Sequence, residues 1–222
     1  MNGKDAPPRP PPDEFDFVLR RARYDMRSPL HAITMLSSAL VDELEGGLDD
    51  RQKLFLDQLG RAGRRLRLQS EAFFRWLDLV DVTLAPEDVN PLRLVARVAH
   101  ERGLEFPISG TGAWRGDPAL LSELLGQVLD NATRFVPSEE APRVVIEVQG
   151  ETLLVHDGGL GVPEERREEV FEPFRRLHTS EEFPGAGMGL TVARRIATLH
   201  GGSIRFIEPA LGGASVEVRI PG

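Results

Sequence analysis

The sequence predicts an α+β protein in which an N-terminal antiparallel helical hairpin precedes an α/β sandwich. Two runs of apolar residues at helical spacing occupy the first part of the chain, and short β-branched runs alternate with further helical runs after Pro86. The chain has 222 residues, of which 41% are hydrophobic and 28% charged, so it is long enough for two small domains with cores of their own.

The first part carries two long helical runs. Apolar residues from Phe15 to Leu44 recur every three or four positions until Gly46–Gly47, and a second run from Phe55 to Val80 is close to a heptad pattern. Two such helices form a hairpin whose apolar seam is covered when two copies associate into a four-helix bundle. We therefore predict a flexible proline-rich lead at residues 1–13 and a helical dimerisation domain at residues 14–85.

The second part, residues 86–222, mixes helices with strands. The strand-like runs contain β-branched residues, and glycine pairs separate several of the elements. The expected elements are a helix over 91–101, the strand-like EFPIS, a helix over 117–135, the strands RVVIEVQ and TLLVHD, a helix over 187–200, and the closing strands SIRFIE and ASVEVRIP. This order indicates a sheet with helices on one face.

Composition excludes several functions. The net charge of −8 argues against nucleic-acid binding, and the absence of cysteine excludes disulfides and thiolate chemistry. None of the five histidines are paired at the i, i+4 spacing of a helical metal site. No apolar run has the roughly 18 to 20 residues of a membrane helix, and the N-terminus does not resemble a signal peptide. We therefore expect a cytoplasmic protein without a membrane segment.

Three segments of the second part could carry chemistry. Glu123, Gln127 and Asn131 lie at i, i+4 and i+8 and so share one helix face. DGGLGVP begins at Asp157 after an apolar strand, and GAGMGL, residues 185–190, leads into a helix whose N-terminal amides could hold phosphates. Each signal is weak alone, because helices normally have a solvated stripe and glycines often mark simple turns.

The order of these segments is informative. The chain from about Asp117 to Pro221 resembles the ATP-binding domain of the histidine kinases, within the superfamily shared with Hsp90, MutL and gyrase. LLGQVLDNATRF matches the asparagine box, DGGLGVP the first glycine box, VFEPF the phenylalanine box, and GAGMGLTVARRIATLHGGSI the second glycine box. The resemblance implies an α/β sandwich of the Bergerat type.

The resemblance also implies roles for individual residues. Asn131 would ligate the Mg²⁺ that bridges the nucleotide phosphates, and Asp157 would accept a hydrogen bond from the adenine amino group. Arg134 would lie near the phosphates and Phe135 against the adenine. The remaining nucleotide-binding positions are Gly159, Gly161, Gly185, Gly187, Gly189 and Leu190.

Two further polar residues and one segment of the chain also correspond to parts of the family domain. Glu123 and Gln127 correspond to catalytic positions, but the family commonly has asparagine where this chain has Gln127, a difference that would weaken Mg²⁺ binding without abolishing it. Residues 175–184 correspond to the segment that covers the nucleotide.

The hairpin resembles a family element as well. Histidine kinases carry H-[DE]-x-R-[ST]-P-L on the first helix, where the histidine accepts the γ-phosphoryl group and the adjacent acid helps to remove its proton. This chain has YDMRSPL at residues 24–30, so Tyr24 takes the acceptor position beside Asp25. Pro29 still predicts a helix kink. A phenol with a pKa near 10 is mostly protonated at neutral pH and is a poorer acceptor than imidazole.

These features favour a protein of two-component signalling that binds Mg-ATP but lacks the usual acceptor histidine. As a pseudokinase or scaffold, it would form a homodimer through the hairpin and regulate a response regulator or a partner kinase. An active kinase is the alternative, with His31, Tyr24 or a histidine of another protein as acceptor. Two other possibilities are that Tyr24 replaces a natural histidine by mutation, and that the chain is an anti-sigma-factor-type serine kinase, although such kinases lack the hairpin.

Overall fold

The computed structural model describes residues 30–33, 35–36, 39–40, 49–137, 141–178, 183 and 185–222. The described residues divide into two units between Leu77 and Asp78. The predicted division at residue 85 falls in the segment that follows the first unit. The proline-rich lead and most of the first predicted helix lie outside the described residues.

The first unit contains α2 (Asp50–Asp78), the helix that the near-heptad spacing predicts. Its N-terminus is closed by a reciprocal capping box, in which the Gln52 amide N–H donates to Asp49 Oδ1 at 2.8 Å and the Asp49 amide N–H donates to Gln52 Oε1 at 2.9 Å. Residues 30–33, 35–36 and 39–40 are helical and belong to the first predicted run.

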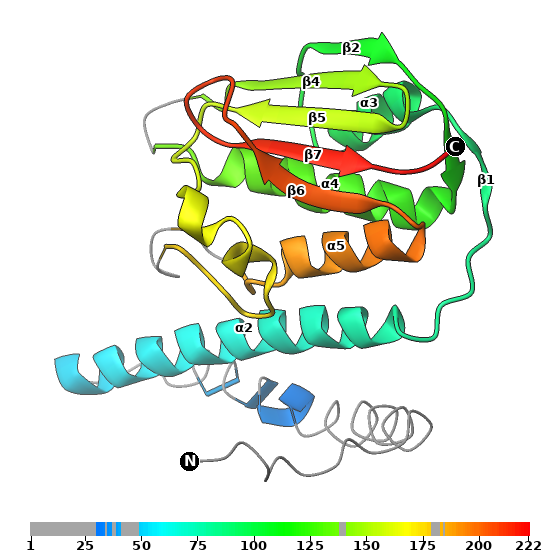
Figure 1. Ribbon diagram of the computed structural model, residues 1–222. Helices are drawn as coiled ribbons and strands as arrows, with labels where there is room; N and C mark the ends of the chain where they lie inside the picture. Colours follow the sequence, from blue (N-terminus) through cyan, green and yellow to red (C-terminus); the bar gives the residue numbers. More distant parts are fainter. Residues whose placement is uncertain are drawn as a thin grey trace, which may run out of the picture. The chain divides into compact units, whose positions relative to one another are not determined.

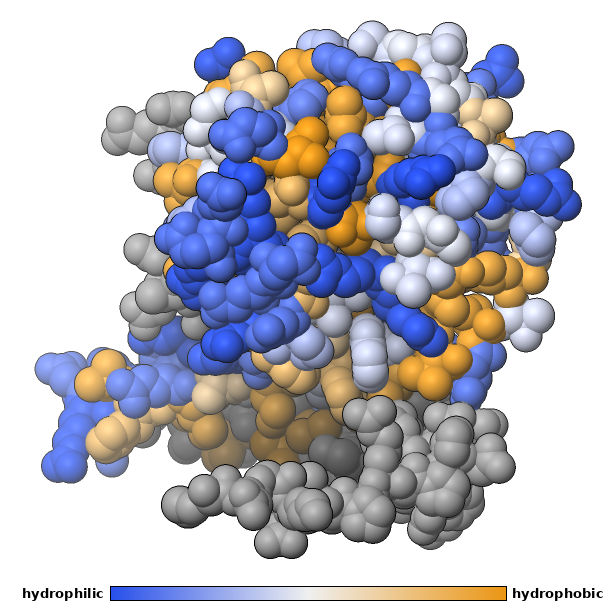
Figure 2. Space-filling view, viewed as in Figure 1, coloured by the Kyte–Doolittle hydropathy of each residue, from blue (hydrophilic) through white to orange (hydrophobic). Residues whose placement is uncertain are grey.

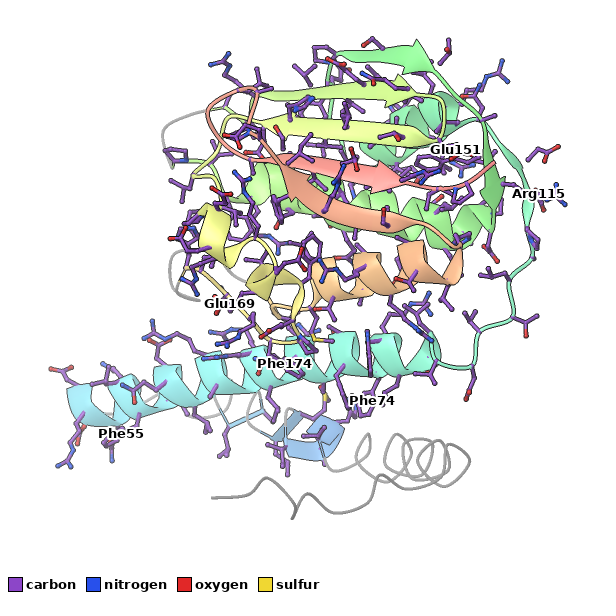
Figure 3. The ribbon with its side chains drawn as sticks, viewed as in Figure 1. Phe55, Phe74, Arg115, Glu151, Glu169 and Phe174 are labelled. Atoms are coloured by element: carbon purple, nitrogen blue, oxygen red, sulfur yellow. The ribbon has the colours of Figure 1, made fainter. Side chains whose placement is uncertain are left out.

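Apolar side chains are distributed unevenly along α2. Toward its N-terminus Phe55 is 54% exposed, whereas near its C-terminus Phe74 is only 4% exposed (Figure 3). The large apolar residues of α2 that remain exposed are Leu54, Phe55, Leu59 and Leu68. The predicted dimerisation through the hairpin would cover such residues, and it stays a prediction.

The second unit is built on a five-stranded sheet in the order β2-β4-β5-β7-β6 (Figure 1). β2 pairs with β4 in parallel, and the other neighbours are antiparallel. The strands are β2 (Ile108–Thr111), β4 (Val144–Gln149), β5 (Thr152–Asp157), β6 (Ser203–Ile207) and β7 (Ser215–Arg219). The mixed helix and sheet architecture confirms the α/β sandwich.

Three helices accompany this sheet, namely α3 (Pro91–Glu101), α4 (Pro118–Arg134) and α5 (Gly189–Leu199). α4 and α5 lie side by side along one face of the sheet, and α3 packs against α4 (Figure 1). Arg102 joins α3 to α4, since its Nε donates to Asp130 Oδ1 at 3.0 Å. Among the helices that the structure describes, none has both the length and the apolar composition needed to cross a membrane.

A second, two-stranded sheet was not predicted. β1 (Glu87–Val89) and β3 (Trp114–Gly116) pair antiparallel, and three residues are too few to show an alternating pattern. Trp114 anchors this sheet, because its side chain is buried and its Nε1–H donates to the Glu151 carbonyl at 2.9 Å. Figure 3 labels Glu151 together with Arg115, whose guanidinium pairs with Asp88 at 2.8 Å.

Two elements begin at least two residues later than expected. The helix expected from Gly187 begins at Gly189, because Gly187 has φ of +71° and so cannot belong to a right-handed helix. The strand expected as EFPIS begins only at Ile108. Pro107 precedes it and has no amide hydrogen, although its carbonyl accepts from Ile146 N at 3.0 Å.

Asp117 joins three parts of the second unit. Its carboxylate caps α4 by accepting from Ala119 N and Leu120 N at 3.0 and 3.2 Å, and it also accepts from Ala85 N in the segment after α2 at 3.2 Å. Its own amide donates to Nε2 of His200, the residue that ends α5. Partial burial works against ionisation, but these backbone hydrogen bonds hold the pKa of Asp117 below its ordinary value.

We expect Asp117→Ala to lower the free energy of unfolding at pH 7 by about 1–2 kcal/mol, the usual cost of losing an N-cap. Because the folded-state pKa of Asp117 lies below the ordinary value, its contribution is complete above pH ~4 and is lost as the pH falls through the folded-state pKa. The difference between wild type and variant should therefore shrink in acid. Urea unfolding along a descending pH series measures it.

Asp88→Ala is the matched control, since Asp88 is 91% exposed in its ion pair with Arg115. Such a surface pair contributes about 0–1 kcal/mol, so the control should change stability little. Equal destabilisation by the two variants, or an Asp117 contribution that persists in strong acid, would contradict this assignment.

Candidate functional site

The predicted polar stripe on α4 is not an ordinary solvated face. Glu123, Gln127 and Asn131 are each half-buried and border the apolar side of the helix. The apolar side consists of the buried residues Leu120, Leu121, Leu124, Leu125, Val128, Leu129 and Ala132. The stripe is therefore only partly exposed, which favours a site over a simple surface.

Asp157 ends β5 as a buried carboxyl that is only 6% exposed. Its Oδ1 accepts hydrogen bonds from Gly159 N and Ala214 N, both at 2.9 Å. Burial raises the pKa of Asp157, and the two backbone hydrogen bonds oppose that shift. Within the described part of the chain Oδ2 accepts no hydrogen bond, so one oxygen is held in place while the other is available to a ligand donor.

Glycines allow three backbone segments to meet around this carboxyl. A Cβ on Gly213 would overlap Gly159 N and Asp157 Oδ1, and a Cβ on Gly159 would overlap the carbonyl oxygen of Phe135. The same Phe135 carbonyl accepts from Leu160 N at 2.9 Å, which fixes the end of α4 to the first glycine box. Gly213 was not among the predicted site residues, although the Gly212–Gly213 pair before the last strand was a signal for it.

The second glycine box meets α4 at Gln127 and Arg134. A Cβ on Gly189, at the start of α5, would lie 2.6 Å from Gln127 Oε1, and one on Gly185 would lie 2.9 Å from Arg134 Nη1. α5 has no side-chain cap at its N-terminus, so the first-turn amides of this 11-residue helix carry the positive end of the helix dipole. Together with Arg134, these amides suit an anionic group.

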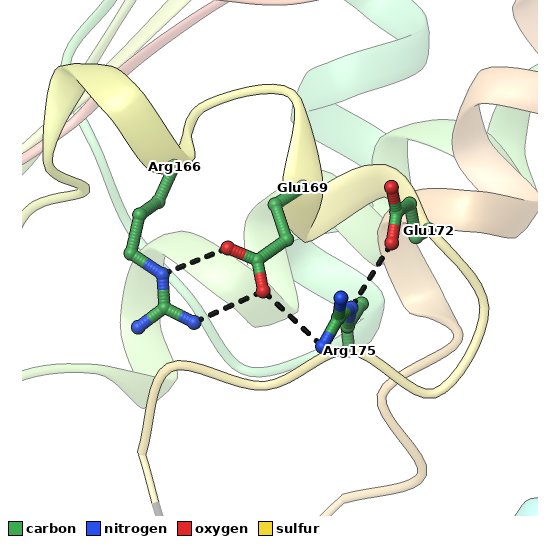
Figure 4. A network of polar contacts seen from close by, with 4 residues as sticks. All are labelled: Arg166, Glu169, Glu172 and Arg175. Atoms are coloured by element: carbon green, nitrogen blue, oxygen red, sulfur yellow. Dashed lines mark hydrogen bonds and ion pairs between the residues drawn. The ribbon is translucent and has the colours of Figure 1, made fainter.

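An ion-pair network holds the segment between the glycine boxes, which contains the short helices η1 (Glu164–Arg166) and η2 (Glu169–Phe171) (Figure 4). Arg166 binds both carboxylate oxygens of Glu169, at 2.9 and 3.2 Å. Arg175 lies 3.4 Å from Glu169 and donates to Glu172 at 3.0 Å. The hydrogen bond from Arg166 lowers the pKa of Glu169. Figure 2 shows a broad hydrophilic area over these two helices.

The phenylalanine box is attached to the core through Phe171. Its ring packs against Phe206 at 5.5 Å between centroids, and the Arg194 guanidinium of α5 lies 3.7 Å from its centroid. Phe174, labelled in Figure 3, has a left-handed backbone with φ of 64°, which is uncommon for a bulky residue. In the sequence, Glu172 and Arg175 of the ion-pair network lie on either side of Phe174.

The structure thus brings most predicted site residues into two groups. Phe135, Asp157 and Gly159 meet at the end of β5, and Gly161, with φ of +73°, would place a Cβ 2.9 Å from the Gly213 carbonyl oxygen. Gln127, Arg134, Gly185 and Gly189 meet where α4 approaches α5. Gly187 would place a Cβ 3.0 Å from Arg175 O, and Leu190 is half-buried in the first turn of α5. Tyr24 and Asp25 lie outside the described residues.

The side-chain oxygen atoms on α4 could bind a magnesium ion only together with a bound ligand that supplies further oxygen atoms. Among the described residues, no group of three or more His, Asp or Glu side chains is arranged to hold a metal. Mg²⁺ prefers oxygen donors and is commonly bound by one or two side chains together with substrate phosphates and water. Asn131, half-buried on the same helix as Arg134, offers such an amide oxygen.

Comparison with protein families matches residues 116–222 to the model described as "Histidine kinase-, DNA gyrase B-, and HSP90-like ATPase". The matched range begins at the end of β3 and contains α4, both glycine boxes and the last strand.

Curated relatives are histidine kinases. The circadian input-output histidine kinase CikA of Synechococcus elongatus is 27% identical over 89% of this chain and 29% of its own length. The signal transduction histidine-protein kinase/phosphatase MprB of Mycobacterium leprae is 34% identical over 65% of this chain and 32% of its own. The chain thus spans about a third of the length of these relatives.

Solved structures that resemble this chain include histidine kinases. The mycobacterial sensor histidine kinase MprB has a TM-score of 0.51 and 28% identity, covering 62% of this chain and 98% of that one. Full-length ShkA in complex with AMPPNP has a TM-score of 0.59 over 91% of this chain and 44% of that one, and at 24% identity it shows a shared fold.

We expect Gly213→Ala to lower the free energy of unfolding by about 1–3 kcal/mol, because the added methyl group overpacks the contact between Gly159 and Asp157. Gly158→Ala is the matched control from the same site, since its Cβ would lie at an ordinary 3.5 Å from Arg143 Cβ. Chemical denaturation of both variants measures the difference. Similar stabilities for the two would show that the site does not require this close approach.

Proposed function

Since residues 116–222 belong to the family of histidine kinase-, DNA gyrase B- and HSP90-like ATPases, we propose that they bind Mg-ATP and that the chain acts in two-component signalling without the usual acceptor histidine. The observation that carries this proposal is the buried Asp157 carboxyl, which has one oxygen saturated by backbone amides and the other available. A carboxylate in this arrangement selects a ligand that presents an N–H group, as adenine does through its amino group.

The rest of the ligand fits the second group of residues. Phe135, whose backbone carbonyl meets Gly159 beside Asp157, offers an aromatic ring for contact with the base. Arg134 and the uncapped N-terminus of α5 offer positive charge for the phosphates. Magnesium, held by Asn131 and the phosphates, would neutralise part of their charge. Glu123 and Gln127 extend the same polar stripe.

The acceptor position decides what the bound nucleotide does. Tyr24 in the sequence YDMRSPL is a poor phosphoryl acceptor, so we propose a pseudokinase or scaffold. Its nucleotide state would control contacts of a hairpin homodimer with a response regulator or a partner kinase.

An active kinase is the second candidate, and one observation favours it. His31 is exposed within the helical residues 30–33, so its imidazole is accessible to a phosphoryl donor. It lies seven residues after Tyr24, about 10 Å along a helix axis, which would separate it from Asp25.

Incubation with γ-labelled ATP and Mg²⁺ separates these candidates. The pseudokinase proposal expects saturable ATP binding and no label on the wild-type chain. Acid-labile, base-stable label that disappears in Asn131→Ala would instead identify phosphohistidine and overturn the proposal, and His31→Ala would then test the second candidate. Absence of nucleotide binding would overturn both.

We expect Asp157→Asn to change base selectivity. The Asn side-chain oxygen would still accept hydrogen bonds from the two backbone N–H groups, so its NH₂ group would take the place of Oδ2. Two hydrogen-bond donors, this NH₂ and the adenine amino group, would then face each other. Losing a hydrogen bond to a charged group weakens binding by about 1.5–3 kcal/mol, so ATP affinity should fall at least about tenfold. ITP, which has a carbonyl at that position, should lose less. Calorimetric titration with both nucleotides measures the ratio.

Asp130→Asn is the matched control, because it makes the same chemical change at a different place. Asp130 lies on α4 and pairs with Arg102 rather than with the groups around Asp157. It should leave the ratio of ATP to ITP affinity unchanged. An unchanged ratio in Asp157→Asn would mean that Asp157 does not contact the base.

A further inference from the structure

Three aromatic side chains meet beside the end of α4. The ring centroid of Phe135 lies 5.1 Å from that of Phe183 and 5.7 Å from that of His178, and the last two lie 5.4 Å apart. All three residues are half-buried. Each ring therefore contacts the other two, although they come from segments more than forty residues apart in the sequence. We call these three residues the aromatic clasp.

Arg176 fastens this cluster through the backbone. Its Nη2 donates to the Phe183 carbonyl, its Nη1 donates to the Gly185 carbonyl, and its Nε donates to the His178 carbonyl at 3.4 Å. One guanidinium thus binds the backbone carbonyls of His178 and Phe183, the two residues whose rings contact Phe135. Since a guanidinium offers five N–H donors in a rigid plane, it fixes the two carbonyls relative to each other.

The spacing of the rings leaves no room for a base between them. Atoms in van der Waals contact lie about 3.5 Å apart, so a base stacked between two rings requires their separation to be about 7 Å. The Phe135–Phe183 and Phe135–His178 separations are 5.1 and 5.7 Å. A base that stacks on the same face of Phe135 must therefore displace Phe183 and His178.

We propose that His178 and Phe183 compete with the adenine base for the ring of Phe135, so that opening of the aromatic clasp sets nucleotide affinity. This inference rests on the proposed function, in which Phe135 contacts the base. The apparent dissociation constant of a ligand equals the intrinsic constant divided by the fraction of protein in the competent state. Removing either ring raises that fraction and strengthens binding.

The test compares dissociation constants for Mg-mant-ADP in wild type, Phe183→Ala and His178→Ala. An aromatic pair contributes an interaction equivalent to about two- to tenfold in an equilibrium constant, so each variant should bind about two- to tenfold more tightly. His100→Ala is the control for loss of an imidazole, because His100 is exposed on α3, and it should bind as wild type does. Unchanged or weaker binding by Phe183→Ala and His178→Ala would overturn the proposal.

Adenosine, which has no phosphates, shows whether the rings affect binding of the base or binding of the phosphates. If the rings compete with the base, Phe183→Ala should strengthen adenosine and mant-ADP binding by the same factor. Tighter binding of mant-ADP alone would place the effect at the phosphates and overturn the proposal. Phe183→Leu, which keeps an apolar side chain in place, should give an intermediate gain, and thermal unfolding checks that each variant is folded.

The proposed function and the aromatic clasp fail in different ways. If neither wild type nor any variant binds nucleotide, the proposed function fails, and the competition fails with it. If wild type binds and the two variants bind no more tightly, only the aromatic clasp is wrong. Arg176 is left unchanged in these experiments because its guanidinium also lies close to Gly185 in the second glycine box.

Discussion

The site depends on the burial of one carboxyl group, Asp157, at the end of β5. A buried carboxylate is costly unless it is hydrogen-bonded, and here two backbone amides, from Gly159 and Ala214, bind the same oxygen. Those amides come from the first glycine box and from the turn before β7. Holding Asp157 therefore brings two loops together, and the glycines at positions 159 and 213 are small enough to allow it.

The other parts of the site follow from how α4 is placed. Asp117 caps its N-terminus, and Phe135 closes its C-terminus by accepting from Leu160 N. Between these ends the apolar side packs into the core, and Gln127 of the polar stripe meets Gly189 of the second glycine box. One helix thus reaches both places where a nucleotide would be bound, at the base near Asp157 and at the phosphates near Gly185.

Sequence patterns predicted the elements that are long or regularly spaced. α2 and α4 were expected from helical spacing, and the order of the glycine boxes indicated the family whose model matches residues 116–222. The small sheet of β1 and β3 was missed because strands of three residues have no detectable alternation. The Gly212–Gly213 pair indicated only a turn, and the contacts of Gly213 with Asp157 and of Phe183 with Phe135 are long-range contacts that spacing does not reveal.

The most direct test of this account is to follow backbone amide signals by NMR while ATP is added with Mg²⁺. The account predicts saturable shifts at Gly159 and Ala214, which hold Asp157, and at Leu160, which binds the end of α4. GTP, which has a carbonyl where adenine has its amino group, should cause much smaller shifts at the same concentration. Equal shifts with both nucleotides, or shifts that leave these three amides unchanged, would contradict the account.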